Sequence, residues 1–323
     1  MREENRQIFR TEDLKVSIKE NGSEYPVVRG VDLHVKKGGC TGIIGESGCG
    51  KSVLCRAVLG VLPRQKWTVQ GKMFLDGENV PFLEDEKMNA FRGSRMTMIV
   101  QNPLSAFDPR MTVKAHFLEG CYRKDRKKRY QDTLEQLKRM YIHSPEAVME
   151  SYPFQLSGGM LQRVLIALSL LTNPDFLIAD EPTTALDSTV QSEILKLLKG
   201  LQRERGISVL LISHDLEVIS KMADTVCVMY AGQVVEEGDT EILKTSPLHP
   251  YTRGLFRSRP AFSKERLTAM EGKPPQLEEI AKLGCAFADR CPLCVSRCRE
   301  QTPELLETTE GHLCRCFRIK ERP

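Results

Sequence analysis

The stretch Gly45-Glu46-Ser47-Gly48-Cys49-Gly50-Lys51-Ser52 decides the fold of this 323-residue chain. It fits the pattern G-x-x-x-x-G-K-[ST], follows the apolar run Cys40 to Ile44, and precedes a run from 52 to 62 with helical character. Glycines let the backbone curl so that successive N–H groups point at phosphates. Lys51 adds a positive charge, and the Ser52 hydroxyl suits Mg²⁺. The sequence therefore predicts a nucleoside triphosphate with Mg²⁺ as the ligand.

Composition limits the remaining classes of protein. The chain is 41% apolar, enough for one large core or two smaller ones, and no segment approaches the roughly 20 apolar residues of a membrane span. No N-terminal apolar stretch resembles a secretory signal, and the scattered cysteines favour a reducing compartment, so we expect a cytoplasmic protein. With 47 basic and 43 acidic residues the net charge is +4, which argues against a nucleic-acid partner.

A pair of acidic residues follows a second apolar segment. Phe176 to Ala179 has the pattern of a buried parallel strand, and Asp180-Glu181 comes at its carboxyl end. Asp180 is predicted to hold the Mg²⁺ shell. Glu181, which alternation places on the other side of the strand, is predicted to polarise the attacking water.

A third apolar segment, Ser208 to Ile212, ends in Ser213-His214. Open α/β sheets bind ligands at the carboxyl ends of their strands, so His214 is expected to contact the γ-phosphate and the attacking water. The alternation of strands with a loop and a helix predicts an α/β fold with a largely parallel sheet.

Leu156-Ser157-Gly158-Gly159 opens a helical run that continues to Leu171. One interpretation of Ser157 is an ordinary helix N-cap. The other is a second anion-binding helix start, with Ser157, Gly158 and Gly159 facing a phosphate. Because the chain already has one phosphate loop, the second interpretation implies that two chains share each nucleotide.

These motifs together resemble the nucleotide-binding subunit of an ABC transporter, over residues 11 to 318. The phosphate loop, Gln101 in Gln101-Asn102-Pro103, the signature Leu156 to Gly159, the acidic pair, Ala185-Leu186-Asp187 and His214 occur in that family's order. The implied fold is a P-loop ABC ATPase cassette, with a RecA-like core of mainly parallel sheet, an antiparallel β subdomain and a helical signature subdomain at about 104–160.

The resemblance also implies roles for residues that the chemistry alone does not assign. ATP would be sandwiched in a head-to-tail dimer, between the phosphate loop of one cassette and residues 157–159 of the other, with Asp187 in the D-loop beside it. Gln101 would sense Mg²⁺ near the contact with the membrane subunit. Tyr25 is the candidate for stacking on adenine, with a simple strand-edge aromatic as the alternative.

The C-terminal part resembles one branch of that family, the oligopeptide, dipeptide and nickel importer ATPases. The resemblance lies in residues 249–255, 272–277 and 284–292. It implies a cassette at 1–245 and a C-terminal extension at 246–323. The stretch from Pro247 to Pro275 is expected to lead away from the cassette, into a small module stapled by its cysteines at 285–316.

The cysteines of this extension suggest a metal. Cys285, Cys291, Cys298 and Cys316 match the family's spacing, and in that family this set is associated with a [4Fe–4S] cluster. Zinc is the first alternative, with Cys294 and Cys314 as further thiolates, and unmetallated thiols or disulfides are the second. Cys316 is favoured over Cys314 as the fourth ligand because, as in the family motif, it lies four residues after His312.

The sequence thus predicts an ATPase subunit of an ABC importer on the cytoplasmic face of the membrane. Its expected partners are a second ABC ATPase subunit, in a heterodimer or a homodimer, two transmembrane permease subunits and a solute-binding protein. Oligopeptides or dipeptides are the expected cargo, with nickel or another metal chelate as the alternative. A soluble ABC ATPase of DNA repair is less favoured, because no sustained heptads separate Lys51 from Gln155. A metal or redox sensor built around the cysteines is the other alternative.

Overall fold

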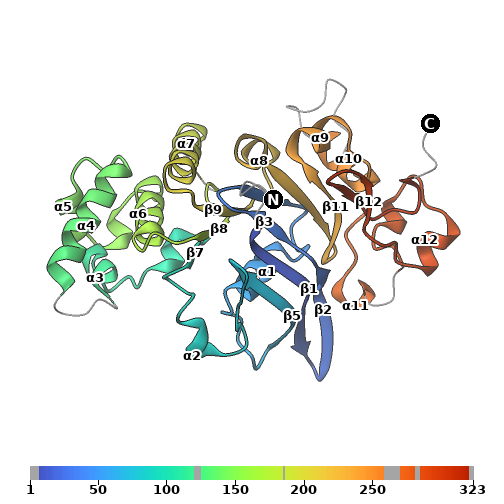
Figure 1. Cartoon of the computed structure of the whole chain (residues 1–323), viewed down its shortest axis with the longest axis horizontal. Helices are drawn as coiled ribbons and strands as arrows, with labels where there is room; N and C mark the ends of the chain where they lie inside the picture. The colour runs from blue at the N-terminus through green and yellow to red at the C-terminus, as the bar shows by residue number, and fades with distance from the viewer. Residues whose placement is uncertain (1–6, 120–124, 185, 258–269, 281–283, 320–323) are drawn as a thin grey trace.

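The computed structural model describes residues 7–119, 125–184, 186–257, 270–280 and 284–319. Its elements lie along one long axis: helices α3 to α6 are at one end, and α11, α12 and β12 are at the other (Figure 1). Two sheets lie between these ends. Within the described ranges, no helix combines the length and the apolar character needed to cross a bilayer.

The larger sheet has eight strands in the order β12-β13-β11-β10-β4-β9-β8-β7. Five consecutive strands that end at the β7 edge, β10-β4-β9-β8-β7, pair in parallel, and the pairs from β10 to β12 are antiparallel. In chain order the strands are β4 (Cys40–Ile44), β7 (Met96–Ile99), β8 (Phe176–Asp180), β9 (Ser208–Ile212), β10 (Thr225–Tyr230), β11 (Gln233–Asp239), β12 (Leu306–Thr309) and β13 (His312–Cys314). The predicted parallel α/β sheet is confirmed.

Strands β4, β8 and β9 are buried on both faces, which explains their unbroken apolar sequences. Ile43 and Ile178 face one core, which also contains α1 (Lys51–Val58) and the antiparallel sheet. Their neighbours Ile44 and Leu177 face a second core, which is covered by helices α6 to α8. The strands that end at the candidate site are therefore held rigidly from both sides.

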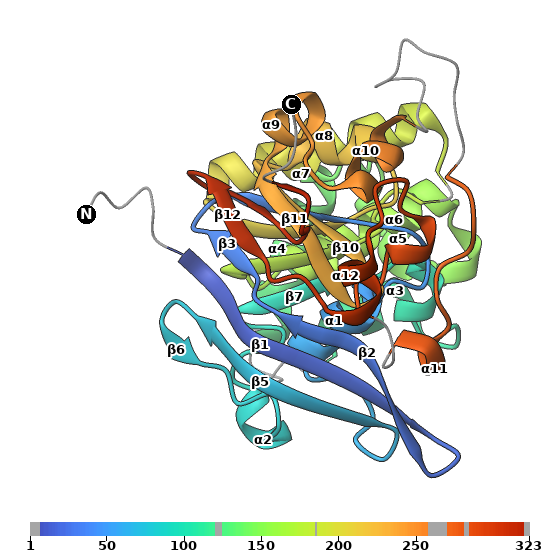
Figure 2. The same ribbon diagram turned by 90° about the vertical axis from the view of Figure 1, so that its right-hand side faces the viewer.

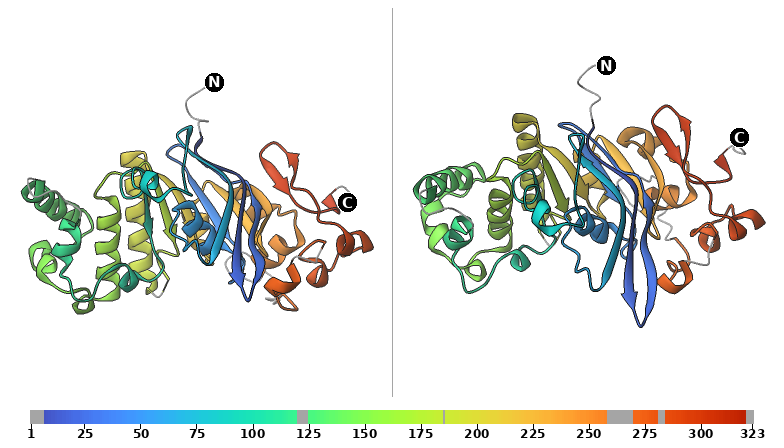
Figure 3. Two further views of the ribbon diagram at one scale, coloured as in Figure 1. Left: turned by 90° about the horizontal axis from the view of Figure 1, so that it is seen from below. Right: turned by 60° about the horizontal axis from the view of Figure 1, so that its bottom comes forward.

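The second sheet has five strands, with the path β2-β1-β5-β6 and with β3 also paired to β1. Every pairing in it is antiparallel, as the resemblance implied. Figure 3 shows this sheet crossing the middle of the molecule, between the two ends. Its strands are β1 (Gln7–Glu20), β2 (Ser23–Val31), β3 (His34–Lys36), β5 (Trp67–Leu75) and β6 (Glu78–Asn79).

Helices dominate the segment between β7 and β8, where the sequence predicted a helical subdomain. Within residues 103–119 and 125–170, the named elements are the 3₁₀ turns at Pro103–Ala106 and Pro153–Gln155 and the helices α3 (Val113–Leu118), α4 (Arg126–Arg139), α5 (Pro145–Glu150) and α6 (Gly158–Leu170). The other helices are α2 (Asp85–Met88), α7 (Ser188–Arg205), α8 (Leu216–Met222), α9 (Thr240–Thr245), α10 (Pro250–Arg257), α11 (Leu277–Ile280) and α12 (Ser296–Glu300).

Parts of the C-terminal segment, which was expected to lead away from the cassette, pack against it. Strand β13 pairs antiparallel with β11 and with β12, so these two short strands extend the main sheet; Figure 2 shows β12 near β11 at this edge. Tyr251 of α10 and Phe287 are buried in the same core as α6 to α8. These two side chains lie on either side of residues 258–269, which are outside the described residues, and their burial in the cassette's core removes apolar surface from water.

Candidate active site

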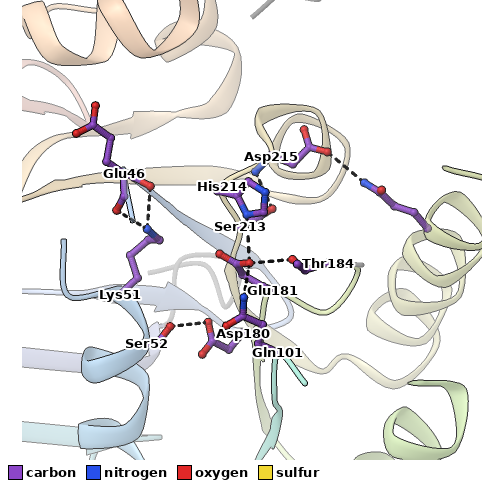
Figure 4. A network of polar contacts seen from close by, with 12 residues as sticks. Glu46, Lys51, Ser52, Gln101, Asp180, Glu181, Thr184, Ser213, His214 and Asp215 are labelled. Atoms are coloured by element: carbon purple, nitrogen blue, oxygen red, sulfur yellow. Dashed lines mark hydrogen bonds and ion pairs between the residues drawn. The ribbon is translucent and has the colours of Figure 1, made fainter. Parts of the chain in front are cut away.

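The phosphate loop connects β4 to α1. Lys51 is only 7% exposed, and its Nζ donates to the carbonyl oxygens of Gly45 and Glu46, at 2.8 and 2.9 Å. Its ammonium group therefore lies inside the curve of the loop, where phosphate oxygens would replace the carbonyls as acceptors (Figure 4).

Two loop glycines are required by close approach of other strands. Gly45 has a φ of 156°, and a Cβ there would lie 2.2 Å from the carbonyl oxygen of Met229 in β10. Gly50 has a φ of 103°, and a Cβ there would lie 2.8 Å from the carbonyl oxygen of Val27 in β2. The loop is thus packed between the two sheets, and its curvature does not depend on a ligand.

Asp180 lies across from the start of α1, at the carboxyl end of β8. The Ser52 hydroxyl donates to its Oδ1 at 3.2 Å. Burial raises the pKa of Asp180, and the adjacent Glu181 carboxylate raises it further, while the hydrogen bond from Ser52 opposes the shift. A buried carboxylate beside a hydroxyl fits a hard cation, so these two side chains suit Mg²⁺.

Glu181 is the centre of the polar network in Figure 4. Its Oε2 accepts hydrogen bonds from Gln101 Nε2 at 3.0 Å and Thr184 Oγ1 at 2.8 Å, and His214 Nδ1 lies 3.1 Å away. The segments that follow β7, β8 and β9 therefore meet at one carboxylate oxygen. Because β8 and β9 are parallel neighbours, both deliver their last residues to this edge of the sheet.

The Glu181 side chain was predicted to point away from Asp180 through the alternation of a strand, but Glu181 lies in a turn. The residue lies just beyond β8 and has a φ of 48°, a left-handed conformation that is uncommon outside glycine. Its N–H donates to the carbonyl oxygen of Ile212 at 2.9 Å, which ties the ends of β8 and β9 together. A turn, and not continued strand alternation, therefore aims its carboxylate away from Asp180. Backbone strain of this kind is typical of functional sites.

The signature Ser157 is an N-cap, because its Oγ accepts from the N–H of Met160 at 3.3 Å. A Cβ on Gly159 would lie 2.9 Å from Val190 of α7, whereas one on Gly158 would meet open space. Asp187 caps α7, accepting from the N–H groups of Thr189 and Val190.

Residues 157–159 and Asp187 line one open cavity of about 590 Å³. In the described part of the chain, no phosphate-loop residue lines that cavity. Ala185, the first D-loop residue, lies outside the described residues. The structure therefore does not bring the signature and the phosphate loop together within one chain.

Tyr25 lies in β2 and is half-buried opposite Ile18 of β1. It is two residues from Val27, whose carbonyl oxygen approaches Gly50. Its strand thus packs against the phosphate loop, and the adenine-stacking role stays a prediction.

The C-terminal cysteines form no disulfides in the described part of the chain, and several of them lie close enough to affect one another electrostatically. Burial raises the pKa of Cys285 to about 11, and the nearby Cys298, Cys291 and Cys316 raise it further. Burial also raises the pKa of Cys291, with added contributions from Cys316, Cys294 and Cys298. Among the described residues, no group of three or more His, Cys, Asp or Glu side chains is arranged to hold a metal ion.

Sequence reasoning missed several residues that contact the site. Thr184 lies three residues after Glu181, a helical-turn distance that could have suggested its hydrogen bond. Arg290 and Tyr251 contact Glu46 from the C-terminal segment, at separations of 244 and 205 residues. No local pattern signals contacts of that kind.

Comparison with known proteins agrees with this geometry. Residues 28–184 match the family model described as ABC transporter, and residues 235–298 match the one described as oligopeptide/dipeptide transporter, C-terminal region. A dimeric cassette, MJ0796, solved in a post-hydrolysis state with ADP and Pi, has a TM-score of 0.63 and 27% identity. That match covers 72% of this chain and 98% of the cassette.

Two relatives match over nearly their whole length. The oligopeptide transport ATP-binding protein AppD of Bacillus subtilis is 38% identical, with 97% of each chain covered. The dipeptide transport ATP-binding protein DppD of Escherichia coli is 36% identical, with 96% of each chain covered. On its motifs, its fold and this identity, the chain belongs to the oligopeptide/dipeptide transporter family of ABC ATP-binding proteins.

Proposed function

We propose that this chain is the ATP-hydrolysing subunit of a membrane ABC importer of oligopeptides or dipeptides. The observation that carries the proposal is the meeting of Gln101, Glu181 and His214 beside the Ser52–Asp180 pair and Lys51. The names of AppD and DppD supply the cargo class.

The geometry supports a division of roles in hydrolysis. Lys51 and the amides of the phosphate loop neutralise phosphate charge, while Ser52, Gln101 and Asp180 organise Mg²⁺. Glu181 orients and activates the attacking water, because its carboxylate is fixed by donors on several sides. His214 contacts the γ-phosphate from the adjacent strand end.

The second half of each nucleotide site comes from another cassette. Support comes from the cavity at residues 157–159 and Asp187, which lies apart from the phosphate loop of its own chain. The MJ0796 structure with ADP and Pi is dimeric. We place the chain as a peripheral subunit at the cytoplasmic face, paired with a second ABC ATPase subunit and two permease subunits, and served by a solute-binding protein. Residues 104–160 receive the permease contact.

We also propose a [4Fe–4S] cluster held by Cys285, Cys291, Cys298 and Cys316. Support comes from the proximity of the thiols, since Cys298 and Cys316 both act on the pKa values of Cys285 and Cys291. In the described residues the four thiols are not arranged as a metal site, so cluster binding would draw them together. Cys316 is preferred to Cys314 because it acts on both Cys285 and Cys291, whereas Cys314 is fully buried in β13. A bound cluster would act as a structural staple.

The substitution Glu181→Gln tests the proposed hydrolysis. In the assembled complex it should bind ATP with Mg²⁺ yet lower the turnover rate by about 100-fold or more, and closed dimers should accumulate. Glu241→Gln is the matched control, because the Glu241 side chain is exposed and pairs with Lys244 on the surface. A normal rate in Glu181→Gln would contradict the assignment.

Iron and acid-labile sulfide analysis tests the cluster. The purified complex should contain about four irons and four sulfides per chain if the cluster is present. Cys298→Ala should lose both, and Cys294→Ala should retain them. Zinc in place of iron, or full iron content after Cys298→Ala, would overturn this part of the proposal.

A further inference from the structure

The C-terminal segment holds the phosphate loop directly. Arg290 donates from Nη1 and Nη2 to the two carboxylate oxygens of Glu46, at 2.8 and 2.9 Å. The Arg290 side chain is 6% exposed and that of Glu46 is 24% exposed. A two-bond, largely buried pair of this kind fixes both the position and the orientation of the carboxylate.

Arg290 is itself fixed by its surroundings. Nη1 also donates to the Tyr230 hydroxyl at 3.2 Å, and Nε donates to the carbonyl oxygen of Glu271 at 3.0 Å. The guanidinium lies over the rings of Tyr230 and Phe287, at 5.7 and 5.8 Å. The arginine therefore has a single arrangement, and it imposes that arrangement on Glu46.

The backbone of Glu46 is held from the same side. Its N–H donates to the Tyr251 hydroxyl at 2.8 Å, and Tyr251 is fully buried in α10. The carbonyl oxygen of Glu46 accepts from Lys51 Nζ. Arg290 therefore fixes the side chain of Glu46, and Tyr251 fixes its backbone N–H. The carbonyl group of the same residue contacts Lys51.

The contact with Arg290 affects the charge of the phosphate loop as well as its geometry. In Figure 4 the Glu46 carboxylate points away from the Lys51 ammonium. Without Arg290, the carboxylate would be an uncompensated negative charge at the start of a loop that must receive triphosphate. Gly48 has a φ of 82°, and a Cβ there would meet open space, so this part of the loop has room to move with that side chain. Both effects would weaken phosphate binding.

We propose that Arg290 is a positioning residue for ATP binding, through which the cysteine-bearing segment sets the geometry and charge of the phosphate loop. The inference rests on the proposed ATPase function. It assigns to the C-terminal segment a part in the nucleotide site itself, in addition to its place at the edge of the main sheet. A purely structural anchor would instead stabilise the fold and leave the affinity for ATP unchanged.

The test is ATP hydrolysis by the full transport complex in lipid nanodiscs, with KM and kcat measured separately. Arg290→Gln should raise KM for ATP by about tenfold, with a smaller change in kcat, and Arg290→Lys should recover part of the loss because it keeps the charge. Arg299→Gln is the control, since Arg299 is exposed, lies in the same segment and pairs with Asp289.

The double variant Glu46→Gln with Arg290→Gln separates the effect of charge from the effect of loop position. It leaves no unpaired carboxylate but still removes the bonds between the C-terminal segment and the loop, so its KM should lie between those of Arg290→Gln and the unmodified complex. A KM in Arg290→Gln within about twofold of the unmodified value would overturn the inference, as would a double variant no better than the single one. If neither the unmodified complex nor Arg299→Gln hydrolysed ATP, the proposed function itself would fail.

Discussion

Glu236 in β11 is a buried carboxylate that joins three parts of the chain. It is 0% exposed, and it accepts from the N–H groups of Leu248 and His249, at 2.6 and 2.8 Å. His312 Nε2 in β13 lies 2.8 Å from its Oε1. Burial alone would raise the pKa of Glu236, but these hydrogen bonds outweigh it and lower the pKa.

We expect Glu236→Gln to lower the free energy of unfolding at pH 7 by about 3 kcal/mol. The amide replaces one acceptor oxygen with an NH₂ group, so a buried N–H would face another donor. An unpaired buried donor costs about 1–3 kcal/mol, and loss of the charge weakens the remaining bonds. Because the native pKa of Glu236 is lowered, its stabilising effect is present above the unfolded value near 4.5 and is lost as pH falls through the native pKa.

Urea unfolding followed by circular dichroism measures the global effect, and amide hydrogen exchange at Leu248 and His249 measures the local one. Both amides should exchange faster in the variant, since their acceptor is weakened. Glu307→Gln, in exposed β12, is the control. An unfolding free energy within about 0.5 kcal/mol of the unmodified protein, with unchanged exchange at both amides, would refute this account of Glu236.

Three further outcomes follow from other contacts. Glu237→Gln should raise the free energy of unfolding at pH 8 by about 1 kcal/mol and flatten its pH dependence between about 4.5 and 7. The reason is that burial raises the pKa of Glu237 to about 7, so the free energy of unfolding falls as pH rises through this window. Urea unfolding of both proteins across this pH range measures the effect, and identical pH dependence in the two proteins would contradict it. Gly45→Ala should reduce binding of a fluorescent ATP analogue by about 100-fold or more, because its Cβ would meet the carbonyl oxygen of Met229; undiminished binding would contradict the packing argument. Thr184→Val should lower kcat by about tenfold with KM for ATP nearly unchanged, as it removes one donor to Glu181, and an unchanged kcat would show that this hydrogen bond is dispensable.

Local sequence patterns predicted the parts of the site that depend on neighbouring residues. The glycines around Lys51 and the apolar runs before Asp180 and Ser213 correspond to a loop and two strands in the structure. Their convergence was also predictable, because parallel strands bring their carboxyl ends to one edge. The turn that redirects Glu181 was not predictable, since a left-handed φ at a glutamate has no sequence signature.

The sequence by itself determined the chemistry of this protein: a phosphate loop, a carboxylate pair and a histidine, in an order that only a parallel α/β sheet brings together. Tertiary structure alone decided what holds that chemistry in place. The Arg290–Glu46 pair spans 244 residues, and β13 joins the main sheet with only three residues. Neither the ion pair nor the strand pairing leaves a helical or strand periodicity in the sequence. Both exist because burying the C-terminal apolar side chains against the cassette brings distant polar groups within hydrogen-bonding distance.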